Sequence, residues 1–166
     1  AGPGNNGGDG FVAARRLAAW GISSIAVLVG QGEKPGTPDA ARNWSRLNDL
    51  ARVQRIHAPV ARDVSILGQG VEKAGVVVDA LLGTGVRGQL RDPVREAVNV
   101  IRRARAAGVP VLAVDTPTAV YLTSGDPSDP VVRADLTVTF HRPKTGLRAR
   151  VGSALAGRIL VAPIGI

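Results

Sequence analysis

The residues best suited to chemistry stand at the start of the chain, which reads AGPGNNGGDG. Glycine lets backbone N–H groups approach a ligand with no Cβ in the way. A helical pattern follows over residues 11–20, and a helix N-terminus offers unpaired donors and partial positive charge. We therefore predict a cradle for phosphate or another anion rather than a flexible linker, because linkers rarely carry paired asparagines before an amphipathic helix. Its ligand-binding residues are Asn5, Asn6, Gly7, Gly8 and Asp9.

A second glycine-rich segment follows an apolar run at residues 75–82. Its glycines have the spacing G-x-G-x-x-G, which is weak alone but typical of nucleotide binding between a strand and a helix. The predicted binding residues are Gly83, Thr84, Gly85, Val86, Arg87, Gly88 and Gln89. An ordinary NAD-dependent dehydrogenase would also need an acidic residue about 20 positions further on. Asp115 lies too far along the chain for that role, and we expect no separate substrate domain within these 166 residues.

Two aspartates accompany apolar runs. Asp79 lies within one, where a carboxylate either accepts bonds from backbone amides or binds a ligand, and the sequence leaves both roles open. Asp115 ends the run at residues 110–114, and catalytic groups collect at the carboxyl ends of strands in open sheets. We therefore prefer a functional role for Asp115 over a turn-forming one. Asn6, Asp79 and Thr118 are oxygen donors that could together hold a hard cation such as K⁺.

The remaining titratable residues are less informative. Lys144, one of three lysines, either neutralises an anionic ligand or is solvated. His57 is expected at the surface of a connecting segment. Neither histidine has the spacing to carboxylates that a metalloprotease or a catalytic triad needs.

Apolar runs alternate with helical patterns along the chain. Strands are predicted at residues 24–29, 75–82, 110–114, 136–140 and 158–162, and helices at 38–53 and from Asp92 to about Gly108, with Asp92 as the cap. This alternation predicts an α/β, Rossmann-like three-layer fold with a mostly parallel central sheet. No strand precedes the first glycine-rich segment, so we expect the first strand to be missing and residues 1–166 to form one N-terminally incomplete domain.

Composition excludes several classes of protein. With no cysteine, disulfides, zinc–thiolate sites and thiol nucleophiles are absent. No apolar run could cross a bilayer, so we expect a cytoplasmic protein with no membrane partner. The net charge of +8 would suit anionic ligands, or it reflects a GC-rich genome, since the arginines are scattered. Aromatic residues make up only 3%, too few for a surface that stacks nucleic-acid bases.

Four segments together resemble the YjeF N-terminal domain, the NAD(P)H-hydrate epimerase family. They are residues 2–10, 78–85, 114–117 and 137–147, in the family's order. The resemblance implies a Rossmann-like fold and interconversion of the R and S epimers of hydrated NADH and NADPH. It also implies a homodimer, one K⁺ per subunit, and a fused or separate NAD(P)H-hydrate dehydratase as partner.

The resemblance also assigns roles to residues. Residues 5–9 and 83–89 would bind the hydrated dinucleotide, together with Asp115, which is the candidate acid/base group. Asn6 and Asp79 would bind K⁺, and Thr118 keeps a hydroxyl where the family's serine does so.

Residues 118–121 depart from the family pattern. Ala119 replaces a glycine and Tyr121 an acidic residue. The alternative function is a non-catalytic module of the same fold that binds nucleotide or RNA, or dimerises.

Overall fold

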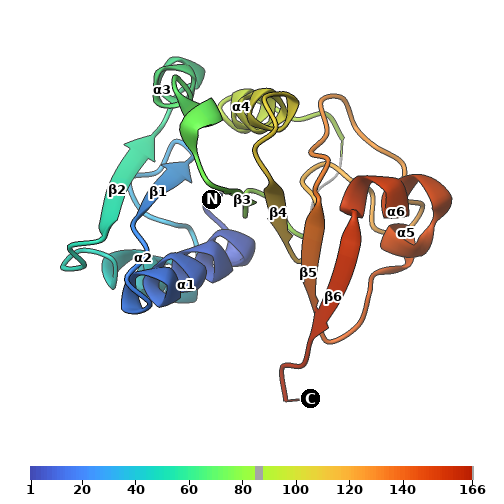
Figure 1. The fold of residues 1–166 in the computed structure, drawn as a ribbon, viewed down its shortest axis with the longest axis horizontal. Helices are drawn as coiled ribbons and strands as arrows, with labels where there is room; N and C mark the ends of the chain where they lie inside the picture. The colour runs from blue at the N-terminus through green and yellow to red at the C-terminus, as the bar shows by residue number, and fades with distance from the viewer. Residues whose placement is uncertain (85–87, 166) are drawn as a thin grey trace.

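The computed structural model describes residues 1–84 and 88–165 and shows parallel strands with helices packed against them (Figure 1). One sheet pairs β1 (Ser24–Val29) with β2 (Val53–Ala58). The other has the order β3 (Val77–Asp79), β4 (Val111–Val114), β5 (Leu136–Phe140) and β6 (Arg158–Ala162). Every pairing of these strands is parallel. The predicted α/β class is confirmed, and the strands at residues 24–29, 136–140 and 158–162 have the predicted bounds.

Helices cover both faces of the strands. On one side α1 (Asn5–Ala19) packs with α2 (Pro38–Ser45), and on the other α3 (Ala61–Leu67) and the short η1 (Val71–Lys73) pack with α4 (Val94–Ala106) (Figure 1). The short helices α5 (Thr145–Arg148) and α6 (Arg150–Ala156) lie beside β5 and β6. Each helix of the described ranges is too short or too polar to cross a lipid bilayer.

The two sheets meet at the first two residues of the chain. The N–H of Val29 in β1 donates to the Ala1 carbonyl at 2.8 Å, and the N–H of Gly2 donates to the Ala80 carbonyl beyond β3 at 2.9 Å. A Cβ on Gly2 would come within 1.9 Å of the Leu81 carbonyl oxygen, so only glycine fits. The start of the chain is therefore held against β1 and the end of β3.

The helix predicted over residues 11–20 begins earlier, because most of the first glycine-rich segment is part of it. α1 already begins at Asn5, with Gly4 as an N-cap that provides no side-chain hydrogen bond. The glycines instead allow close packing: a Cβ on Gly7 would lie 1.8 Å from the Gly2 carbonyl oxygen, and one on Gly10 2.6 Å from the Cβ of Ala80. Tertiary packing overrides the poor helix propensity of glycine and asparagine here.

The predicted helix at residues 38–53 was wrong in its second half. α2 ends at Ser45, and β2 begins at Val53. Thr37 caps α2 by accepting a hydrogen bond from the Ala40 N–H at 3.4 Å. His57 is therefore not in a connecting segment but in β2, half-buried, with its Nε2 2.7 Å from the Gly30 carbonyl oxygen.

Two other predicted bounds also need correction. The strand predicted at residues 75–82 pairs only over β3. The predicted cap Asp92 is not the N-cap of α4, because that position is Pro93 and no side chain caps the helix. The buried residues of α4 include Ala97, Val98 and Ile101.

Candidate active site

The loops after β3 and β4 are joined by the buried side chain of Asp79. Its Oδ2 accepts the Thr118 N–H at 2.7 Å, and its Oδ1 accepts the Thr118 hydroxyl at 2.7 Å and the Leu81 N–H at 3.2 Å. The sequence left open whether Asp79 accepts hydrogen bonds from backbone amides or binds a ligand. The structure shows the first of these roles. These bonds fix the segment that contains Asp115 against the end of β3.

Asp79 and Thr118 are both fully buried. Burial raises the pKa of the Asp79 carboxyl above its ordinary value, while the hydrogen bonds from Thr118 and Leu81 lower it again. No lysine, arginine or histidine among residues 1–84 and 88–165 forms an ion pair with Asp79. The positive charge of the Ala1 ammonium also acts on Asp79 and lowers the pKa of its carboxyl.

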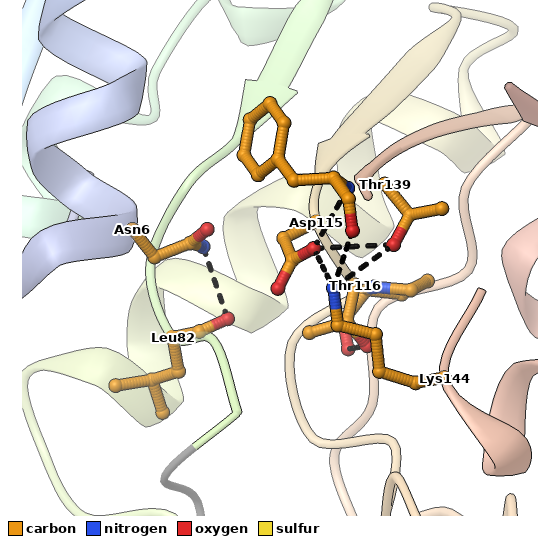
Figure 2. Close-up of polar contacts among 8 residues, drawn as sticks. Asn6, Leu82, Asp115, Thr116, Thr139 and Lys144 are labelled. Carbon is orange, nitrogen blue, oxygen red and sulfur yellow. Dashed lines mark hydrogen bonds and ion pairs between the residues drawn. The ribbon is translucent and has the colours of Figure 1, made fainter. Parts of the chain in front are cut away.

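Asn6 reaches the same loops from α1. Its Nδ2 donates to the Leu82 carbonyl at 3.1 Å (Figure 2), and the N–H of Leu82 donates to the Thr118 hydroxyl oxygen at 3.2 Å. A Cβ on Gly83 would lie 3.2 Å from the Cβ of Asn6, so the two glycine-rich segments approach closely. The three predicted metal ligands thus belong to one hydrogen-bond network, although Asn6 contacts Leu82 rather than the other two.

Asp115 directly follows β4 and adopts a left-handed backbone, with φ of 64°. The N–H of Thr116 donates to the Val114 carbonyl at 2.8 Å, so Asp115 is the central residue of a tight turn of a rare and strained type. Strain of this kind is common in active sites, and aspartate tolerates it better than most residues. The turn points the carboxyl group toward the end of β5.

There Oδ1 of Asp115 accepts three hydrogen bonds. The donors are the Thr139 hydroxyl at 3.1 Å, the Phe140 N–H at 3.2 Å and the Lys144 ammonium, which also forms an ion pair with it (Figure 2). The sequence left the role of Lys144 open and did not select Thr139 or Phe140. The signal for Lys144 was its rarity in an arginine-rich chain and its place just after a strand.

Asp9 lies one turn into α1, and the charge of Asp115 affects the pKa of its carboxyl. Although Asp9 is exposed, desolvation of its carboxyl by the surrounding residues raises its pKa, and the negative charge of Asp115 adds to the rise. This coupling places the first turns of α1 and the turn after β4 in one electrostatic environment. Close contacts join Asn6, Gly83 and the loop that contains Thr118 and Asp115, and the charge of Asp115 also acts on Asp9.

The other predicted binding residues are less closely tied to this network. Asn5 is exposed, Gly7 and Gly8 are buried inside the α1 packing, and Thr84, Gly88 and Gln89 are exposed. Gly85, Val86 and Arg87 lie outside the described residues.

The departure at Ala119 has a structural cost. Ala119 is buried and has φ of 74°, a conformation that costs a residue with a Cβ about 1–2 kcal/mol. Glycine would adopt it freely. Because the N–H of Val132 donates to the Thr118 carbonyl and that of Ser128 to the Ala119 carbonyl, the surrounding loop holds this backbone in place.

Two further features bear on the location of the site. A cavity of about 900 Å³ lies between β1, β3 and α4, lined by apolar residues such as Val27, Val77 and Ile101. None of the described site residues lines it. No cluster of three or more histidine, cysteine, aspartate or glutamate side chains suited to a metal ion is found in the described ranges.

Comparisons with known proteins identify the family and the fold of this chain. Residues 1–146 match the family model described as YjeF-related protein N-terminus. The chain belongs to this family. The fold is that of a yeast crystal structure, YNL200c, with a TM-score of 0.79 and 24% identity over 99% of this chain and 64% of the yeast chain.

Curated relatives cover the whole chain. A Methanothermobacter thermautotrophicus protein named bifunctional NAD(P)H-hydrate repair enzyme Nnr is 43% identical over 99% of this chain and 31% of its own length. A Cenarchaeum symbiosum protein named NAD(P)H-hydrate epimerase is 36% identical over 100% of this chain and 72% of its own. The chain thus spans about a third of the length of the bifunctional relatives it matches.

We predict that the Thr118 hydroxyl is required for stability. Thr118→Val keeps the shape but leaves the Leu82 N–H without its acceptor and Asp79 without one donor, and should lower the free energy of unfolding by about 3 kcal/mol. Thr118→Ser keeps the hydroxyl and should lose only about 1 kcal/mol, for one buried methyl group. Urea denaturation of both variants measures the difference, and equal losses would contradict the role of the hydroxyl.

Proposed function

We propose that this chain is an NAD(P)H-hydrate epimerase, which interconverts the R and S epimers of hydrated NADH and NADPH. The observation that carries the proposal is the carboxylate of Asp115 at the carboxyl end of β4. Its Oδ1 is held by three donors, whereas Oδ2 accepts no hydrogen bond from the described residues. Relatives named NAD(P)H-hydrate epimerase match the full chain and support the assignment.

The start of α1 supports binding of the dinucleotide. The Gly4 N-cap provides no side-chain acceptor, so N–H groups in the first turn remain available for an anion. The positive end of a 15-residue helix favours phosphate there. With Gly83 against Asn6, both glycine-rich segments could contact one ligand that extends toward Asp115.

The reaction inverts C6 of the reduced nicotinamide ring, which bears a hydroxyl group beside the ring nitrogen. As an acid, the Asp115 carboxyl gives a proton to the departing hydroxyl; the C6–O bond breaks, water leaves, and the nitrogen lone pair forms a C6=N bond. As a base, the carboxylate removes a proton from the water that adds to the opposite face. Atoms and charge balance over the cycle, and no redox partner is needed.

A potassium ion is part of the proposal. Asp79 supplies a buried negative charge without a cationic side-chain partner among the described residues, and Thr118 and Asn6 supply neutral oxygens in the same network. One carboxylate with neutral oxygens suits a monovalent cation better than Ca²⁺. When bound, K⁺ would neutralise Asp79 and order the segments from α1, β3 and β4 around the ligand.

The names of the relatives indicate which enzyme uses the product of this reaction. Many of them are named bifunctional, so we propose that a dehydratase, fused or separate, uses the S epimer that this domain supplies. The homodimer and the cytoplasmic location stay predictions, as does one K⁺ per subunit.

The first test is Asp115→Asn. The amide is isosteric and its oxygen can still accept from Phe140 and Thr139, so the fold and ligand binding should persist. Loss of the acid/base group should reduce the rate by about 10²–10⁴-fold. The assay starts from one purified epimer of hydrated NADH and follows the other by chromatography, and binding is measured by calorimetry.

Two outcomes would contradict the proposal. Wild-type protein that binds hydrated NADH without equilibrating its epimers would favour the non-catalytic binding module. Full activity of Asp115→Asn would remove Asp115 from the reaction.

The second test addresses potassium. KCl should raise the melting temperature above that in choline chloride at equal ionic strength, because a ligand that binds only the folded state stabilises it. Asp79→Asn should abolish this difference, whereas the exposed control Asp49→Asn should keep it. Equal melting temperatures of the wild type in the two salts would contradict the potassium site.

A further inference from the structure

The three donors on Asp115 all contact the same oxygen. Thr139, Phe140 and Lys144 donate hydrogen bonds to Oδ1 (Figure 2), and no described residue donates one to Oδ2. The side chain of Asp115 is 11% exposed and that of Lys144 is 21% exposed. The ion pair is thus largely removed from water, where its geometry has more effect than at the surface.

The Lys144 ammonium has no donor left for a substrate. An ammonium group has three N–H donors. Besides Asp115, they contact the Thr139 hydroxyl oxygen at 3.2 Å and the Phe140 carbonyl oxygen at 3.4 Å. The sequence left two roles open for Lys144, which were to neutralise an anionic ligand or to be solvated. Neither role matches this arrangement.

The backbone between β5 and α5 places the lysine. His141 has φ of 63°, and the N–H of Arg142 donates to the Phe140 carbonyl at 2.7 Å. This turn has the same form as the one centred on Asp115, and it reverses the chain so that Lys144 lies over the end of β5. Two strained turns, one after each of two neighbouring strands, therefore bring the carboxylate and the ammonium together.

We propose that Lys144 is a positioning residue for Asp115. It holds Oδ1, together with Thr139 and Phe140, and so presents Oδ2 as the oxygen that exchanges a proton with the substrate. The proposal rests on the proposed epimerase activity. Lys144 does not touch the substrate; it acts through the carboxylate.

The test compares Lys144→Met with Lys144→Arg, and with the exposed control Lys73→Met. Because Lys144 acts on the chemical step, Lys144→Met should lower kcat about 10–100-fold, as loss of an orienting partner does at other sites. KM should change less than about threefold, since no substrate contact is lost. Lys144→Arg restores a cationic donor and should recover most of kcat, and Lys73→Met should match the wild type.

A second measurement separates this inference from the function on which it rests. Lys144→Met should lower the urea midpoint in the wild-type background and lower it less, or not at all, in the Asp115→Asn background, because the lost interaction is with the carboxylate. This coupling does not depend on epimerase activity. If the wild type is inactive but the coupling is present, the proposed function fails while the pairing stands.

Other outcomes would overturn the inference itself. A raised KM with unchanged kcat in Lys144→Met would make Lys144 a ligand-binding residue. An unchanged kcat and KM, or equal midpoint losses in both backgrounds, would make the contact with Asp115 incidental to the reaction.

Discussion

The arrangement of the site depends on one buried carboxylate. Asp79 ends β3, and its two oxygens accept the backbone N–H and the hydroxyl of Thr118 in the segment after β4. Thr118 in turn accepts from Leu82, whose carbonyl accepts from Asn6 of α1. An unpaired carboxylate at this depth would cost several kcal/mol, so these segments must stay together for the fold to be stable. The constraint that stabilises the fold also assembles the site.

Strain collects around the same point. The described residues other than glycine with positive φ are Asp115, Ala119 and His141. Asp115 and His141 each turn the chain at the end of a strand, and Ala119 follows Thr118 in the segment that Asp79 anchors. A left-handed conformation at each costs the protein stability. Such strain beside Asp115, whose Oδ2 accepts no hydrogen bond from the described residues, is typical of a catalytic site.

Much of the framework was predictable because local patterns and tertiary packing agree. The runs Ser24–Val29 and Leu136–Phe140 are continuous and bounded, and both are strands. β2 was missed because its sequence, VQRIHA, mixes polar and apolar residues as a half-exposed strand does. The early start of α1 was missed because its glycines are selected by contacts with Gly2, Ala40 and Ala80, which no local pattern reveals.

The sequence motifs identified several residues of the site but not the contacts between them. Asp115 was identified by its position at the end of a strand, Asp79 as a carboxylate within an apolar run, and Asn6 as an asparagine of the first glycine-rich segment. The partner of Asp115 could not be derived in the same way, because the contact with Lys144 depends on the register of β5 beside β4 and on a turn at His141. The ion pair between Asp115 and Lys144 forms only once the strands are assembled, so the sequence alone does not reveal it.

The central claim is that the start of α1 and Asp115 act on a single dinucleotide. A crystal structure of the protein with NADP⁺ and K⁺ tests this claim most directly. The account predicts phosphate at the N-terminus of α1 and the nicotinamide ring with C6 facing Oδ2 of Asp115. A dinucleotide bound instead in the apolar cavity between β1 and β3, or with its nicotinamide ring remote from Asp115, would contradict it.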